Sequence, residues 1–347
     1  TAIMVGTGKG AESGILIKNA ESLELAGRID VVVFDKTGTL TKGKAEVTDV
    51  VAASGYTEAD VLALAASLEK GSEHSLAEAI VKEAETKHAS LTQVTAFKAI
   101  PGHGVEGNVG GKNVAFGNRR LMERERVDIS ALEAQAVTLE EGGKTAMFLA
   151  LDGKAAGIIA VADPLKENAY DGIDVLHQNG IATVMLTGDN ARTAQAIAKM
   201  AGITEVRAEI LPDQKEAEVR RLQKEGKRVA MVGDGINDAP ALAAADVGIA
   251  MGTGTDVAIE AAKITLVNKD LRSVNASIEL SKRTMRTIKQ NLFWAFGYNA
   301  LLVPVAMGIL YPFTGTFINP IFASAAMALS SISVVANSLL LKRFRVM

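Results

Sequence analysis

Three apolar runs in this chain of 347 residues end in small polar or acidic residues, where a sheet can hold reactive groups. The runs are residues 30–35 (DVVVFD), 182–189 (ATVMLTGD) and 228–235 (RVAMVGDG). Because a carboxylate is ionised at neutral pH, Asp35 could attack a phosphoryl group and carry it as an acyl phosphate. An Asp followed by a Gly is also common in simple turns, so this feature alone leaves both interpretations open.

A longer pattern surrounds Asp35: residues 35–41 read DKTGTLT, which resembles the phosphorylation signature of P-type ATPases. Residues 187–189 (TGD) and 233–238 (GDGIND) resemble two further motifs of that family, in the family's order. The resemblance implies that ATP phosphorylates Asp35, and that Asp35, the Thr37 backbone carbonyl and Asp234 hold Mg²⁺. The catalytic candidates are Asp35, Lys36, Thr37, Thr187, Gly188, Asp189, Lys215, Asn237 and Asp238.

Phosphoryl transfer needs positive charge and donors around the oxygens of the transferred group. Lys215, in the segment PDQK at residues 212–215, matches the family lysine that has this role. Thr187 matches a hydroxyl that binds the phosphate. Taken alone, a lysine in such a segment is more often a solvated helix residue.

Position 37 separates two kinds of enzyme that share this fold. Soluble phosphatases typically place a second Asp two residues after the nucleophile, to protonate the leaving group and activate water, whereas this chain has Thr37. We therefore expect the acyl phosphate to persist until another element delivers water, as suits a pump. The alternatives are a membrane-tethered phosphatase and a nucleotide-sensing module without turnover. The nucleotide-sensing module is disfavoured by the intact set of Asp35, Lys215, Asp234 and Asn237.

The elements around these residues predict a doubly wound α/β fold, because buried strands alternate with helices. The expected helices begin at Asp163-Pro164, Asn190 and Pro212 and end at Gly180, Gly202 and Gly226. With the resemblance, this predicts a haloacid-dehalogenase-like phosphorylation domain over residues 21–41 and 154–275. Residues 42–153 interrupt the alternation of strands and helices, with a helix near 58–70 and a Gly-rich region at 99–117. We therefore expect an inserted α+β nucleotide-binding domain.

The inserted segment resembles the nucleotide pocket of the heavy-metal branch of these ATPases. The matching residues are Glu73, His74, Gly102 and Gly104, with Asn118 as a further candidate. Glycines let the backbone approach a purine or phosphate, and His74 could stack on adenine while Glu73 accepts a hydrogen bond from its amino group. The branch usually has Pro where this chain has Ser75, which favours a less rigid loop. The alternative for residues 72–74 is the start of a surface helix.

Two uncharged runs, residues 291–311 and 318–340, are long enough to cross a hydrocarbon core of about 30 Å at about 1.5 Å per residue. Basic residues flank only the outer ends of the pair, which places both ends in the cytoplasm. We therefore expect a transmembrane hairpin in an integral protein of the plasma or inner membrane; a buried core hairpin is the alternative. The remaining segments are expected to be a membrane helix end and stalk at 1–20, a stalk at 276–290 and a tail at 341–347.

Five residues of the hairpin resemble the YN and MxxSS motifs of copper pumps: Tyr298, Asn299, Met327, Ser330 and Ser331. The last three lie on one helix face at spacings of three and four. A thioether suits Cu(I), so the resemblance implies Cu(I) or Ag(I) as the pumped ion. A pump for another heavy metal stays open, since Met and Ser also fill ordinary membrane helices.

The formal net charge of -3 leaves no basic surface for nucleic acid, and the lack of cysteine excludes disulfides and thiolate chemistry in this chain. The resemblance covers only the second half of a family member. It implies ATP and Mg²⁺ as cofactors. The expected partners are the missing N-terminal half, with its actuator domain and earlier membrane helices, membrane lipid and a copper donor protein.

Overall fold

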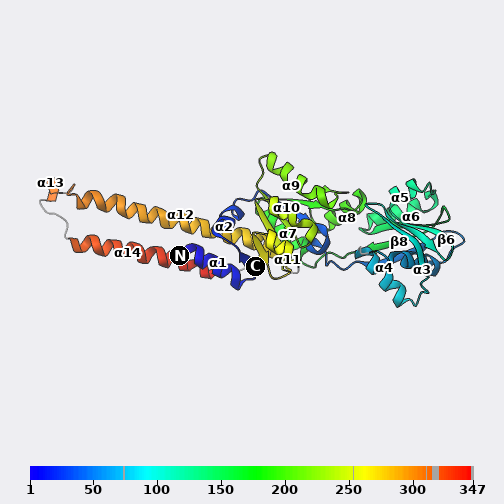
Figure 1. The fold of residues 1–347 in the computed structure, drawn as a ribbon. Coiled ribbons are helices and arrows are strands. Elements are labelled where there is room, and N and C mark those ends of the chain that lie inside the picture. Colours follow the sequence, from blue (N-terminus) through cyan, green and yellow to red (C-terminus); the bar gives the residue numbers. More distant parts are fainter. Residues whose placement is uncertain (73–74, 253, 310, 315–319, 345–347) are drawn as a thin grey trace. The chain divides into compact units, whose positions relative to one another are not determined.

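The computed structural model describes residues 1–72, 75–252, 254–309, 311–314 and 320–344 of the chain (Figure 1). The chain forms two compact units. The first consists of Thr1–Val32, Asp174–Ala182 and Glu216–Met347, and the second of Val33–Ile173 and Thr183–Lys215. The strand β2 (Val31–Asp35) therefore begins in the first unit and ends in the second.

The first sheet has seven strands in the order β1-β13-β12-β11-β2-β9-β10. Besides β2 these are β1 (Ile15–Ile17), β9 (Ala182–Leu186), β10 (Glu205–Arg207), β11 (Val229–Gly233), β12 (Val247–Met251) and β13 (Ile264–Leu266). β12 runs parallel to β11 and β13, β10 runs parallel to β9, and β1 is antiparallel to β13. Every residue of β2, β11 and β12 is buried, as expected for parallel strands covered on both faces.

The strands β2, β9 and β11 begin side by side. The N–H of Asp30 donates to the carbonyl of Arg228 at 3.0 Å, and the N–H of Ala182 donates to the carbonyl of Asp30 at 3.0 Å. The amino ends of the three strands therefore lie together on one side of the sheet, and their carboxyl ends lie together on the opposite side. The strand order reverses at β2, and such a switch point is where α/β sheets bind ligands.

Local capping sets the ends of the helices that accompany this sheet. These helices are α1 (Ala2–Glu12), α2 (Ala20–Ala26), α7 (Ala169–Gln178), α8 (Ala191–Ala201), α9 (Lys215–Lys224), α10 (Ala239–Ala244) and α11 (Asp256–Ala261). The Asn190 side chain accepts the N–H of Thr193 at 3.1 Å to begin α8, which ends at Gly202 with φ of 78°. The predicted bounds at Asn190 and Gly202 are confirmed.

The second sheet has six strands in the order β3-β8-β7-β6-β5-β4, and all of its neighbours are antiparallel. The strands are β3 (Glu46–Ala52), β4 (Val94–Ile100), β5 (Gly104–Val109), β6 (Lys112–Gly117), β7 (Thr145–Leu151) and β8 (Lys154–Ala162). The predicted boundary at residue 153 falls in the turn between β7 and β8. The predicted α+β insert is confirmed as a fold.

Helices cover both faces of the second sheet: α3 (Glu58–Glu69), α4 (Ser75–Thr86), α5 (Arg119–Arg124) and α6 (Ser130–Glu141). One core packs Leu62 of α3 and Ile80 of α4 with Phe116 of the sheet. A second core packs Leu121 of α5 with Phe148 of the sheet. The sheet is thus a layer between two helical layers, and the predicted helix near 58–70 is α3.

Two long helices follow the first sheet: α12 (Arg272–Ala306) and α14 (Pro320–Leu339), with the short α13 (Tyr311–Thr314) between them. α12 and α14 run side by side (Figure 1), and Asn291 of α12 donates to the hydroxyl of Ser338 at 2.9 Å. Over the described residues, none of the helices is both long and apolar enough to cross a membrane. The spans 291–311 and 318–340 stay predictions.

Candidate active site

Asp35 is the last residue of β2, and its carboxylate is paired with Lys215, the first residue of α9. The Nζ of Lys215 donates to Oδ1 of Asp35 at 2.6 Å, and the two side chains are only 11% and 9% exposed. A buried carboxylate needs such a partner. The ammonium also places positive charge where a transferred phosphoryl group would carry negative charge. Because Lys215 is buried, its alternative as a solvated helix residue is wrong.

The segment after Asp35, η1 (Lys36–Leu40), is a tight turn. Gly38 has φ of 72°, a left-handed conformation that favours glycine. Thr37 is exposed and lies in extended backbone, with ψ of 127°. The turn therefore presents the backbone of residues 36–38 next to the Asp35 carboxylate.

A distant segment, residues 163–166, holds this turn in place. The Nζ of Lys166 donates to the carbonyl of Gly38 at 2.7 Å. The hydroxyl of Thr41 donates to Oδ2 of Asp163 at 2.6 Å, and the N–H of Lys44 donates to Oδ1 of the same carboxylate at 3.1 Å. The predicted helix start at Asp163-Pro164 is wrong, because α7 begins at Ala169 and Asp163 instead accepts hydrogen bonds from Thr41 and Lys44. Lys166 was not among the predicted site residues. The charged residues at the two ends of the segment DPLK, residues 163–166, were the only sequence signal for these contacts.

The TGD segment, residues 187–189, follows β9 and contacts the turn at Lys36. The Nζ of Lys36 donates to Oδ2 of Asp189 at 2.7 Å, and these side chains are 13% and 11% exposed. The N–H of Asp189 donates to the hydroxyl of Thr187 at 3.1 Å, and Thr187 is itself buried. A Cβ on Gly188 would be in ordinary contact, with the Ile210 carbonyl at 3.6 Å. Lys36 and Asp189 thus tie two of the predicted segments together.

The third predicted segment, residues 233–238, is shaped by Asp238. Oδ2 of this buried carboxylate accepts the N–H groups of Asp234 and Gly235, each at 3.2 Å. A Cβ on Gly233 would lie 2.7 Å from that oxygen, so the loop requires glycine there. Asp238 therefore positions the loop that carries Asp234, while Asn237 is exposed.

In the second unit, the structure brings Gly102, Gly104 and Asn118 together. The side-chain amide of Asn118 donates to the carbonyl of Gly102 at 2.8 Å, and its Oδ1 accepts the N–H of Leu121 to begin α5. Gly104 has φ of 145°, and a Cβ there would lie 2.2 Å from the Phe116 carbonyl. Asn118 thus fixes the turn that presents the glycines.

Glu73 and His74, the other two pocket candidates, lie outside the described residues. Glu69, at the end of α3, was not selected from the sequence. It is 6% exposed, and its Oε2 has no hydrogen-bond partner among the described atoms. Burial raises the pKa of the Glu69 carboxyl, which a hydrogen bond from Ser72 opposes. Its position at the end of the apolar helix ALAASLE was a signal that could have found it.

The ion-site candidates lie on α12 and α14. The side-chain amide of Asn299 donates to the carbonyl of Ala295 in its own helix at 3.0 Å. The Tyr298 ring lies 6.1 Å from that of Trp294. The carbonyl of Ser330 accepts the hydroxyl of Ser333 at 2.8 Å, and Ser331 is exposed. α14 is helical through residues 327–331, and the shared face of Met327, Ser330 and Ser331 stays a prediction.

Comparison with known proteins identifies the family. The family profile described as haloacid dehalogenase-like hydrolase matches residues 29–246, and a second profile of that description matches residues 216–278. The solved catalytic domain of the CPx-ATPase CopB-B is 30% identical, with a TM-score of 0.59 over 79% of this chain and 98% of that chain. The chain belongs to the P-type ATPases, within the haloacid dehalogenase-like hydrolases.

Two longer proteins resemble almost the whole of this P-type ATPase chain. Copper-transporting ATPase 2 of Rhizobium meliloti (strain 1021) is 52% identical over 99% of this chain and 41% of its own length. A zinc-transporting PIB-type ATPase, solved in an E2.Pi state, is 38% identical with a TM-score of 0.73, over 99% of this chain and 54% of that chain. The chain thus spans about two fifths to one half of these relatives. The predicted phosphorylation-domain fold with its insert is confirmed.

Proposed function

We propose that this chain is the catalytic part of an ATP-driven pump that is phosphorylated on Asp35 and exports Cu(I), or the chemically similar Ag(I). The observation that carries the proposal is the buried pair of Lys215 and Asp35, 2.6 Å apart at the end of β2. A carboxylate held beside an ammonium at a strand end is suited to accept a phosphoryl group.

In the proposed reaction, a carboxylate oxygen of Asp35 attacks the γ-phosphorus of ATP. The bond from that phosphorus to the bridging oxygen breaks, ADP leaves with the electron pair, and an acyl phosphate remains on Asp35. Lys215 neutralises charge on the transferred oxygens, and the Thr187 hydroxyl is available as a further contact. Lys36 and Asp189 hold their two loops in position through their ion pair at 2.7 Å.

The donors proposed for Mg²⁺ are the carboxylates of Asp35 and Asp234 and the backbone carbonyl of Thr37. Asp35 ends β2 and Asp234 follows β11, and these are neighbouring strands of the sheet. Such a set of hard oxygen ligands fits Mg²⁺, so the residues present suit the ion. When bound, Mg²⁺ supplies further neutralisation of phosphate charge. Asp238 fixes the loop that presents Asp234, and its carboxylate lies within 4.8 Å of those of Asp35 and Asp234.

The chain has no acidic residue two positions after the nucleophile, which favours a pump over a phosphatase. Thr37 occupies the position where a soluble phosphatase has its second Asp, and Thr37 is exposed. An acyl phosphate there would wait for another element to deliver water. In a full pump we assign that delivery to the part of the protein that precedes this chain.

ATP is proposed to bind to the second sheet and its helices through the Gly102, Gly104 and Asn118 turn, with Glu73, His74 and the buried Glu69. An orphaned carboxylate oxygen in a buried position suits a ligand that donates a hydrogen bond. The adenine amino group is such a donor.

Copper is favoured over zinc by the composition of the hairpin. Residues 291–340 contain no carboxylate, imidazole or thiolate, the groups that Zn²⁺ prefers, but they do contain the thioether of Met327. The named relatives include both a copper transporter and a zinc transporter, so similarity alone leaves the ion open. We place the hairpin in the plasma or inner membrane with both ends cytoplasmic, and infer a copper donor protein as a partner.

The test of this proposal uses the full-length pump under reducing conditions. ATPase activity should rise with Cu(I) or Ag(I) and respond weakly to Zn²⁺, and Met327→Leu should lower the response to Cu(I) by about tenfold or more while preserving volume. Leu329→Met restores the number of thioethers at another position of α14 and serves as the control in the Met327→Leu background. Equal stimulation by Zn²⁺ and Cu(I), or full Cu(I) response without Met327, would contradict the copper assignment.

A further inference from the structure

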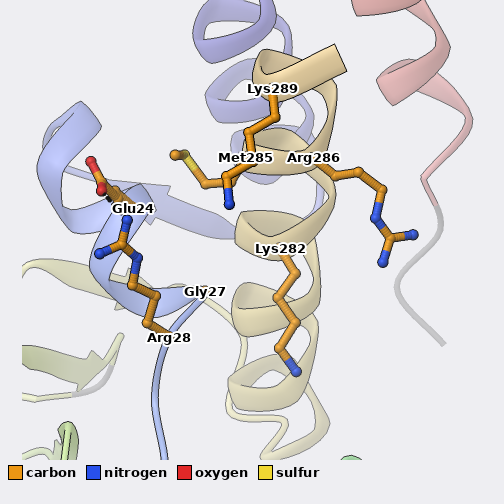
Figure 2. Close-up of a pocket in the computed structure, with 7 residues that line it drawn as sticks. All are labelled: Glu24, Gly27, Arg28, Lys282, Met285, Arg286 and Lys289. Atoms are coloured by element: carbon orange, nitrogen blue, oxygen red, sulfur yellow. Dashed lines mark hydrogen bonds and ion pairs between the residues drawn. The ribbon is translucent and has the colours of Figure 1, made fainter. Parts of the chain in front are cut away.

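A cavity of about 300 Å³ lies where α2 meets α12 (Figure 2). Its charged lining comprises Arg28, Lys282, Arg286 and Lys289, with Glu24 as its acidic member and Met285 between them. Gly27, at the end of α2, makes this close approach feasible, because a Cβ there would lie 3.3 Å from the backbone nitrogen of Lys282. The cavity is therefore a basic groove between two helices of the first unit.

Only part of the positive charge in this groove is compensated. Arg28 pairs with Glu24 at 2.5 Å, and Lys282 pairs with Glu279 at 3.1 Å. Arg286 and Lys289 form no ion pair with the part of the chain that the structure describes. Positions 282, 286 and 289 lie on one face of α12 by their spacing, and in Figure 2 the Arg286 side chain extends to the side of α12 away from α2. The groove thus presents free positive charge suited to an anion.

An exposed apolar surface continues directly from this basic face. Phe293 and Phe296 follow Lys289 at spacings of four and seven, so they share its face of α12, and they are 69% and 71% exposed. A cationic stripe next to an exposed aromatic stripe matches a ligand with an anionic head and an apolar tail. Inorganic phosphate shares the head chemistry but would leave the aromatic stripe uncovered.

We propose that the groove between α2 and α12 binds the phosphate headgroup of an anionic phospholipid. Arg286 and Lys289 contact the phosphate, Arg28 closes the groove from α2, and the acyl chains lie along Phe293 and Phe296. The proposal rests on the membrane placement of α12 given under the proposed function. It adds a defined lipid site to that placement.

Trp294 is the single tryptophan of the chain and is adjacent to Phe293 in the sequence, so its fluorescence reports on this site. The chain is reconstituted in lipid nanodiscs, and quenching of Trp294 by brominated phosphatidylglycerol is compared with quenching by brominated phosphatidylcholine. We expect a clear preference for phosphatidylglycerol, which the double variant Arg286→Gln/Lys289→Gln abolishes. Each basic residue near an anionic surface changes affinity by roughly fivefold, so the loss should be at least tenfold in relative affinity.

The matched control is Lys342→Gln/Arg343→Gln, which removes two exposed basic residues of the same unit outside the groove, in η4 (Leu340–Arg343). This variant should retain the preference for phosphatidylglycerol. If the control loses as much preference as the groove variant, or if the groove variant loses none, the groove assignment is overturned. A general attraction of basic residues to the membrane surface would give the first of these results.

A competition with inorganic phosphate shows whether the groove binds a lipid headgroup or a free phosphate ion. At equal ionic strength, replacing chloride by phosphate should leave the lipid preference unchanged. If phosphate removes the preference, the groove binds a free anion and the lipid assignment fails. Equal quenching by the two lipids would overturn only the lipid site in the groove. No quenching by either lipid would also overturn the placement of α12 in the membrane. Neither result bears on phosphorylation of Asp35, so the two failures are distinguishable.

Discussion

At the scale of single residues, the proposed mechanism depends most on Lys215, which forms a buried ion pair with Asp35 at 2.6 Å. Lys215→Ala removes the ammonium and leaves the carboxylate buried. We expect phosphorylation of the full pump by ATP to slow by about two to three orders of magnitude, as is typical when one charge-stabilising group is lost. Rapid-quench measurements with radiolabelled ATP give the rate.

Lys224→Ala is the control for this substitution, because Lys224 is exposed near the end of the same helix, α9. Its phosphorylation rate should match the wild type. An unchanged rate in Lys215→Ala would remove Lys215 from the proposed mechanism.

Glu69 predicts a pH dependence of stability. Burial raises the pKa of its carboxyl in the folded state above the unfolded value. Folding therefore favours the protonated Glu69 carboxyl. Its contribution to the stability of the folded state is complete below the pKa of the unfolded chain and is lost as pH rises through the pKa of the folded chain. Glu69→Gln should therefore raise the melting temperature at neutral pH, with the gain vanishing at acid pH. Thermal unfolding across this range is the measurement; a gain that is the same at every pH would contradict the assignment.

At the scale of elements, both ends of α8 were predictable because capping is local, whereas the start of α7 at Ala169 was not. Asn190 and Gly202 begin and end α8 through contacts within four residues, and a sequence shows such contacts directly. The strand ends were predictable for a similar reason, since buried parallel strands are continuous apolar runs. These local signals were enough to predict the α/β sheet, whereas the catalytic segments were predicted from their resemblance to P-type ATPase motifs.

Contacts between distant segments were not predictable from the same signals. Lys166 reaches the Gly38 carbonyl across 128 positions in the chain, and nothing near Lys166 in the sequence indicates that partner. The burial of Glu69 likewise results from tertiary packing around α3. Pairing of β8 with β3 and β7 also joins residues far apart, which places residues 154–162 in the second sheet.

That pairing predicts how the insert should be divided from the rest of the chain. β8 lies between β3 and β7, so a segment ending at residue 153 loses the strand that links them. We expect residues 42–162 to fold alone and bind ATP, with weaker binding in Asn118→Ala, which loses the hydrogen bond to Gly102. Residues 42–153 should show no cooperative unfolding. Circular dichroism and calorimetry test both statements, and equal stability of the two segments would contradict them.

At the scale of the whole molecule, the chain covers 41% of a copper-transporting relative, so the proposed pump needs the rest of its sequence. In the proposed pump, this chain supplies the nucleophile at the end of β2, the loops that position it and the two long helices assigned to the ion path. The proposed coupling between these parts depends on a phosphorylated intermediate. The proposed function therefore depends most on phosphorylation of Asp35.

The most direct test is to incubate the full-length pump with ATP labelled at the γ-phosphate, Mg²⁺ and Cu(I), quench in acid and map the label. We expect an acid-stable, hydroxylamine-labile phosphate on Asp35. We also expect that Asp35→Asn forms none while still binding ATP through the inserted domain. Label at the wild-type level in Asp35→Asn, or label mapped to another residue, would show that Asp35 is not the phosphorylated residue.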